Sequence, residues 1–144
     1  MGDITKIEKL LYTAKAHTTG GRDGGSSRTS DGHLDVKLSV PGSTGTGTNP
    51  EQLFAAGFAA CFHGALNLLG KRAAMDIADT VVEVQVSFGR DPMDGGYALV
   101  IDLRVRMPGV DRCVAEEMVR TAERLCPYAK MARQGTVNIV TVVD

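Results

Sequence analysis

The segment NPEQLFAAGFAACFHGALNLLGKR, residues 49–72, decides the fold because it predicts one long helix that is apolar on nearly every side. Its start is marked three times: Asn49 is a good N-cap residue, Pro50 suits the first helical position, and Gln52 can complete a capping box. The two basic residues at its end suit the negative end of a helix. A helix with no polar face must be covered by other elements, so the rest of the chain should form layers around it.

A cysteine lies near the middle of this helix. One helical stripe contains Phe54, Phe58, Cys61, Ala65 and Leu68. Cysteine is a common core residue, and burial among apolar side chains raises a thiol pKa and makes the thiol inert. Cys61 could therefore be a simple core residue, and reactivity would require a compensating positive charge nearby.

Alternating stretches before the helix predict β-strands at residues 12–18 and 34–40. Asp31-Gly32, directly before the second strand, predicts a type I′ hairpin turn. A short strand is expected around residues 28–29, and the glycine-rich residues 20–25 predict an open, flexible loop.

Alternation also predicts strands at residues 82–88 and 97–105, joined as a long antiparallel hairpin by the turn at 94–96. A second helix is expected over residues 111–126, and a final strand over 137–143. The order β-β-α-β-β-α-β, without a repeated βαβ unit, predicts the α+β class with antiparallel sheets packed around two main helices.

Composition limits the class of protein. A chain of 144 residues fits one domain, 1–144, and its hydrophobic (43%) and charged (23%) fractions are ordinary for a soluble protein. A net charge of -1 and the lack of Trp argue against nucleic-acid binding. The apolar run of residues 53–69 is short for a membrane span and contains polar residues, and no signal peptide is recognised, so a cytoplasmic protein is expected. Thiols are kept reduced there, so a disulfide would be transient and catalytic.

A second cysteine ends the second predicted helix. Cys126 falls on the inward stripe of that helix, and Pro127 prevents regular continuation. Like Cys61, Cys126 could be a core residue, but two inward cysteines on two helices can meet. Cys113 lies off the inward stripe in the first helical turn, and we interpret it as a bystander.

Arg22 is the candidate positive charge, since it lies in the glycine-rich loop where the backbone is free to bring it into a pocket. A guanidinium beside Cys61 would stabilise the thiolate. Glu51, in the first turn of the long helix, could hold the arginine in place. Each has an ordinary alternative: Arg22 as a solvated loop residue and Glu51 as an acidic residue favoured at a helix N-terminus. Spacing alone does not pair them.

Other chemistries have weak support. His17, His33 and His63 are scattered, and no spacing typical of a metal site occurs, so no metal and no cofactor are expected. The glycine-rich residues 42–47 precede a helix as in a phosphate-binding loop, but the required lysine is missing.

Several motifs in one order resemble the Ohr branch of the Ohr/OsmC family, the organic hydroperoxide resistance proteins. The resemblance covers essentially the whole chain and rests on YTAKA (12–16), GGRDG (20–24), DGHLDVKL (31–38), NPEQLFAAG (49–57), ACF (60–62) and CPYAK (126–130).

The resemblance implies a cytoplasmic thiol peroxidase that protects against oxidative stress by reducing organic, lipid-type hydroperoxides. By analogy, Cys61 would attack the peroxide and Cys126 would resolve it as a Cys61–Cys126 disulfide. Arg22 would activate the thiolate, and Glu51 would orient Arg22. The family fold is an intertwined α+β homodimer with its active sites at the subunit interface. In this family, dihydrolipoyl-type dithiols return the oxidised enzyme to its reduced form.

The three phenylalanines Phe54, Phe58 and Phe62 could line a pocket for the alkyl chain of a substrate, with core packing as an equal alternative. Phe58 stands where many relatives carry Tyr, and the loop at 42–48 is shorter than in some of them. Two other functions remain open: a redox sensor that uses the same cysteine pair, and a non-enzymatic protein that binds apolar ligands.

Overall fold

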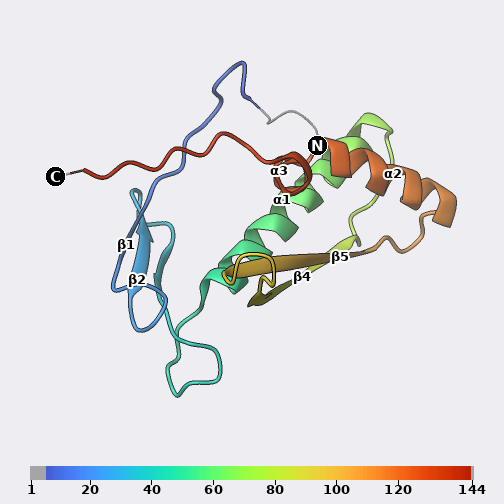
Figure 1. The fold of residues 1–144 in the computed structure, drawn as a ribbon. Helices are drawn as coiled ribbons and strands as arrows, with labels where there is room; N and C mark the ends of the chain where they lie inside the picture. The colour runs from blue at the N-terminus through green and yellow to red at the C-terminus, as the bar shows by residue number, and fades with distance from the viewer. Residues whose placement is uncertain (1–5, 144) are drawn as a thin grey trace. The chain divides into compact units, whose positions relative to one another are not determined.

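The computed structural model describes residues 6–143 and has the α+β architecture expected from the sequence (Figure 1). In chain order its elements are β1 (Ala16–Thr19), β2 (Ser26–Thr29), β3 (Asp35–Lys37), α1 (Pro50–Arg72), β4 (Val81–Arg90), β5 (Tyr97–Arg106), α2 (Arg112–Leu125) and α3 (Pro127–Gln134). The strands form two sheets, β1-β2-β3 and β4-β5.

The chain folds into two compact units that interleave in sequence. One unit contains residues 58–84 and 103–143 together with 6–8, and the other contains 9–57 and 85–102. The prediction of one domain over 1–144 stays a prediction.

The three-stranded sheet is antiparallel and belongs to the second of these units. Its β2–β3 hairpin is closed by hydrogen bonds from the Thr29 N–H to the Leu34 carbonyl and from the Gly32 N–H to the Thr29 carbonyl. The predicted type I′ turn is wrong, because that turn needs positive φ at two successive residues and only Gly32 has it. The predicted strands at 12–18 and 34–40 are reduced to four and three residues.

Helix α1 begins as the sequence predicts. The Asn49 side chain accepts a hydrogen bond of 2.9 Å from the Gln52 N–H, which satisfies one of the free donors of the first turn. The capping box is incomplete, because the Gln52 side-chain oxygen instead accepts from the Thr48 hydroxyl at 2.6 Å.

The part of α1 that belongs to the first unit carries a buried stripe at steps of four residues: Phe58, Phe62, Leu66 and Gly70. A Cβ at Gly70 would approach the Ile77 side chain to 2.9 Å, so a larger residue there would require that side chain to shift. By length and composition α1 could also cross a membrane, but a buried stripe of this kind is typical of the core helix of a globular protein.

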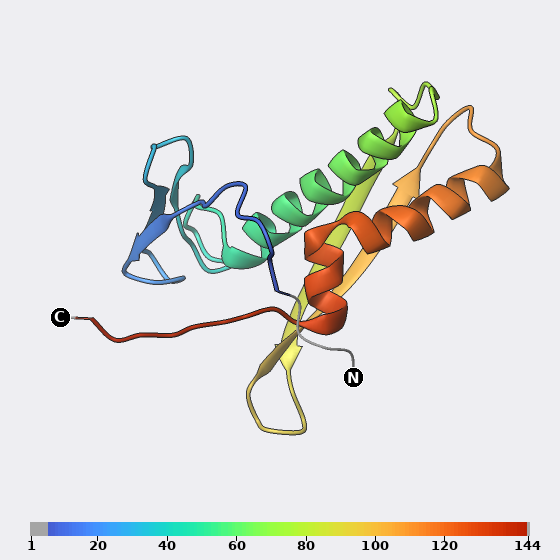
Figure 2. The same cartoon turned by 90° about the horizontal axis from the view of Figure 1, so that it is seen from above.

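The C-terminal third departs from the sequence prediction in two ways. Pro127 does not end helical structure but occupies the first position of a new helix, α3, and Figure 2 shows the chain turning sharply between α2 and α3. The strand predicted at 137–143 is wrong, because these residues form no strand. A strand needs a hydrogen-bonded neighbour, and among the described residues none pairs with this segment, whose valines and isoleucine are largely exposed.

Candidate active site

The two cysteines that the sequence singles out lie side by side. Cys61 is on α1, Cys126 is at the junction of α2 and α3, and their sulfur atoms are 3.5 Å apart. Both are free thiols. A disulfide requires about 2.05 Å between the sulfur atoms, so a displacement of about 1.5 Å would bond the pair.

The two thiols differ in exposure. Cys126 is fully buried, whereas Cys61 is half-buried. The inward stripe of α2 explains this difference, because Met118 is buried about two turns before Cys126 and Ala122 about one turn before it. Of the pair, Cys61 is therefore the thiol that a peroxide can reach.

The start of α3 supplies a hydrogen bond to Cys61. Cys126 is the N-cap residue of α3, and its side chain makes no capping bond to the first turn of that helix. The Tyr128 N–H donates to the Cys61 sulfur. The Tyr128 ring also meets the Phe58 ring of α1 edge-to-face, with 5.6 Å between centroids. Sequence reasoning missed Tyr128, although Pro127 directly after Cys126 was a signal that a helix could begin there.

The environment within this unit does not activate Cys61. Burial raises the pKa of the Cys61 thiol, the adjacent Cys126 raises that pKa further, and the Tyr128 N–H lowers it. The net effect is an elevated pKa, so a thiolate at neutral pH needs positive charge from elsewhere.

The proposed cation and its partner meet in the other unit. The Arg22 guanidinium donates two hydrogen bonds to the Glu51 carboxylate, at 3.0 and 2.8 Å. This bidentate contact lowers the pKa of Glu51 and raises that of Arg22, so both remain charged. Arg22 keeps 41% of its side-chain surface exposed against 14% for Glu51, which leaves the guanidinium accessible.

The loop that carries Arg22 is a tight turn and not the open loop that the sequence predicted. The Gly25 N–H bonds the Gly21 carbonyl, and the Gly25 carbonyl accepts from the Leu38 N–H of the sheet. A Cβ at Gly25 would lie 2.3 Å from the carbonyl oxygens of Gly21 and Thr19, so only glycine fits. The turn therefore presents Arg22 from a defined backbone.

The three phenylalanines of α1 differ in their surroundings. Phe58 and Phe62 are buried in the first unit, and Phe54 is half-buried in the second. Their burial fits core packing and a pocket wall equally, so the substrate-binding role stays a prediction.

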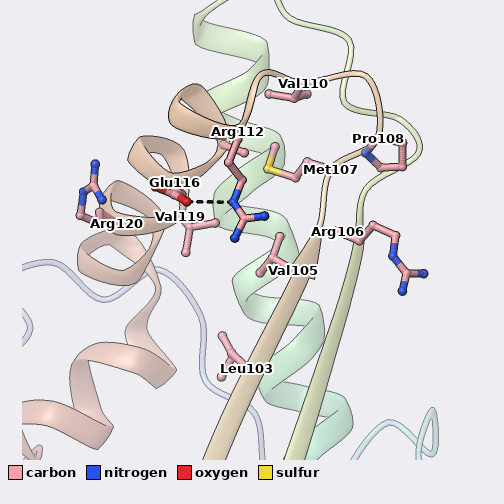
Figure 3. A pocket seen from close by; sticks show the side chains of 11 residues that line it. Leu103, Val105, Arg106, Met107, Pro108, Val110, Arg112, Glu116, Val119 and Arg120 are labelled. Carbon is pink, nitrogen blue, oxygen red and sulfur yellow. Dashed lines mark hydrogen bonds and ion pairs between the residues drawn. The ribbon is translucent and has the colours of Figure 1, made fainter.

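A separate groove lies between the end of β5 and α2, with a volume of about 630 Å³ (Figure 3). Apolar side chains such as Val105 and Val119 form much of its wall, and Arg112 is paired with Glu116, one turn further along α2, at 2.8 Å. None of the described residues that line it is a cysteine, so we place no chemistry there. Cys113 is exposed nearby in the first turn of α2, where its N–H bonds the capping Asp111.

No cluster of three or more metal-ligating side chains occurs among residues 6–143. Among these residues, one histidine contact involves α1. The Nε2 atom of His63 is 2.9 Å from the Thr80 carbonyl oxygen, and this contact ties the helix to the loop before β4.

Comparison with known proteins connects this geometry to a family. Residues 42–141 match the family described as OsmC-like protein. The chain is 42% identical over 137 residues to the organic hydroperoxide resistance protein of Xanthomonas axonopodis pv. citri, covering 92% of this chain and 94% of that protein. It is 44% identical over 132 residues to organic hydroperoxide resistance protein OhrB of Bacillus subtilis, covering 90% of this chain and 95% of the relative. The crystal structure of OhrB superposes with a TM-score of 0.81, over 88% of this chain and 95% of that chain.

Proposed function

The chain belongs to the OsmC-like family, among relatives named for organic hydroperoxide resistance, and we propose that it is a thiol peroxidase that reduces organic hydroperoxides to alcohols. The observation that carries the proposal is the 3.5 Å separation of the Cys61 and Cys126 sulfur atoms. A thiol of intermediate exposure in contact with a buried one has the arrangement that a two-step peroxide reduction needs.

The reaction balances with two thiols and one external dithiol. The Cys61 thiolate attacks the peroxide, an S–O bond forms as the O–O bond breaks, and the released alkoxide takes a proton to become the alcohol. Cys126 then attacks the Cys61 sulfenic acid, forming the disulfide and releasing water. A dihydrolipoyl-type dithiol reduces that disulfide by exchange and is itself oxidised to a disulfide. No cofactor takes part.

The order of attack follows from exposure. Cys61 has access to solvent and an N–H donor at its sulfur, whereas Cys126 is enclosed. A peroxide therefore meets Cys61 first, and Cys126 needs only to move toward a sulfenic acid that is already beside it.

We further propose that the active arginine comes from a second copy of the chain. Glu51 and Cys61 are ten residues apart on α1, and ten residues of helix rise about 15 Å. An Arg22 held by Glu51 would therefore serve Cys61 of the partner subunit in a two-fold symmetric homodimer. This supplies the positive charge that the surroundings of Cys61 lack.

Exposed apolar segments support such a dimer. The C-terminal residues 137–143 carry valines and an isoleucine that are 55 to 96% exposed, and Leu10, Leu11 and Tyr12 are exposed near the other end. Exposed apolar segments of this kind are suited to complete a sheet with a second chain. In the dimer, Phe54, Phe58 and Phe62 would contribute to an apolar pocket that favours organic peroxides. We place the enzyme in the cytoplasm, where dithiol reductants are available.

The test is peptide mapping after one equivalent of cumene hydroperoxide. We expect a Cys61–Cys126 disulfide and catalytic turnover with dihydrolipoamide as reductant. A bridge to Cys113 would refute the assignment of the resolving cysteine. A single stoichiometric burst without turnover would indicate a redox sensor, and full function of Cys61→Ser would indicate a ligand-binding protein.

A further inference from the structure

Arg22 has a second contact besides Glu51, the aromatic ring of Phe88. The guanidinium carbon lies over this ring, 4.9 Å from its centroid. Phe88 is on β4, in the part of that strand that belongs to the same unit as Arg22. A guanidinium within about 6 Å of an aromatic face is attracted by the ring quadrupole. Arg22 is therefore held by hydrogen bonds to a carboxylate and by contact with a ring.

The Phe88 ring is itself fixed by a neighbour. It stacks with the Tyr97 ring of β5, with 5.0 Å between centroids and 17° between planes. The Arg90 guanidinium in turn lies over the Tyr97 ring, at 5.6 Å. Arg22, from the turn between β1 and β2, thus forms one continuous cluster with three side chains of the β4–β5 hairpin. A ring stacked in this way restricts where Arg22 can lie.

Core packing does not account for Phe88. Along β4, Val82, Val84 and Val86 are half-buried and alternate with exposed residues. Phe88 is the next residue in the same alternation as these valines, but it is 48% exposed. A large aromatic side chain left half in solvent has little value to the core. Its defined contacts are the Arg22 guanidinium and the Tyr97 ring.

We propose that Phe88, backed by Tyr97, is a positioning residue for peroxide reduction: it holds the Arg22 guanidinium against Glu51 in the orientation that the thiolate requires. The inference rests on the proposed function, in which Arg22 stabilises the Cys61 thiolate. An arginine side chain is costly to order, and a preformed orientation removes that cost from the reaction.

The first test observes Arg22 directly and does not depend on catalysis. In NMR spectra of the full-length protein, the ring current of Phe88 should shift the Arg22 Nε–H signal. Phe88→Leu should abolish this shift and raise the pKa of Glu51 toward its ordinary value, while Phe88→Tyr should preserve both. Val100→Ala, an exposed apolar truncation in the same hairpin, is the matched control. An Arg22 signal and a Glu51 titration that are unchanged in Phe88→Leu overturn the inference.

The second test measures the rate at which cumene hydroperoxide oxidises Cys61 in a single turnover. Phe88→Leu should slow this step about two- to fivefold, and Phe88→Tyr should restore it. In an Arg22→Gln background, Phe88→Leu should have no further effect, because it acts through Arg22. An equal slowing in both backgrounds overturns the positioning role. If the parent protein shows no peroxide reduction, the proposed function fails, while the NMR result still decides whether Phe88 orients Arg22.

Discussion

The separation of Glu51 and Cys61 along α1 leads to a prediction about mixed dimers. Ten helical residues correspond to a rise of about 15 Å, and we have proposed that an arginine bound to Glu51 would serve the thiol of the other subunit. Consider a heterodimer of one Arg22→Gln chain and one Cys61→Ser chain. One of its two sites then combines an intact Arg22 from one subunit with an intact Cys61 from the other, and the second site lacks both.

The expected activity of this heterodimer is about half that of the parent dimer, since one of two equivalent sites is intact. Both variant homodimers should be nearly inactive. If Arg22 instead served the thiol of its own chain, every site of the heterodimer would lack one essential group, and activity would stay at the level of the variant homodimers.

The assay uses two affinity tags to purify the heterodimer and follows cumene hydroperoxide consumption with dihydrolipoamide. A matched control joins the parent chain to a chain that carries both Arg22→Gln and Cys61→Ser. That dimer should be inactive if Arg22 acts across the interface and about half active if it acts within its chain. The opposite pattern in the two heterodimers, or a protein that is monomeric and fully active, would refute the reasoning.

Two further predictions concern the thiol pair and the ion pair. Cys126→Ser should leave Cys61 oxidisable by one equivalent of peroxide but trap it as a sulfenic acid, which excess peroxide overoxidises; intact-protein mass spectrometry distinguishes these products. Cys113→Ser is the control. Recycling of Cys126→Ser by dithiol at the normal rate would contradict the resolving role. Arg22 lowers the pKa of Glu51 below its ordinary value of 4.5, so the ion pair contributes stability above that pH and loses it as pH falls through the lowered pKa. In urea denaturation from pH 7 to pH 3, the stability difference between the parent and Glu51→Gln should be constant near neutrality and shrink only in the acidic range; a difference independent of pH would show that the charge of Glu51 is not involved.

Local signals in the sequence were sufficient for the elements that depend on local chemistry. The start of α1 was predicted because Asn49 and Pro50 act on the residues next to them, and the structure confirms the cap. The β4–β5 hairpin was predicted for the same reason. Pro127 was misinterpreted because the residue that ends one helix is also favourable as the first residue of the next, and only the observed turn between α2 and α3 decides between these.

Long-range contacts could be named as candidates but not assigned. Arg22 and Glu51 are 29 residues apart, and no pattern of spacing pairs them. The contact of Arg22 with Phe88 was not anticipated, because the two residues are far apart in the sequence and no spacing pairs them. The strand predicted at 137–143 did not form, because alternation along one segment says nothing of whether another strand lies beside it, and none does among the described residues.

The division of the chemistry between two units resolves a conflict at Cys61. An apolar surrounding selects organic peroxides but also raises the pKa of the thiol, and a permanent cation packed beside Cys61 in the same core would carry a large desolvation cost. Keeping Arg22 on a separate, partly exposed support avoids that cost, because Glu51 and Phe88 hold the guanidinium while it remains hydrated. In the homodimer that we propose, a second chain would bring the cation to the thiol. On this reasoning, an isolated subunit would retain the Cys61–Cys126 and Arg22–Glu51 contacts. Its Cys61 would nevertheless be protonated and would react slowly with peroxide.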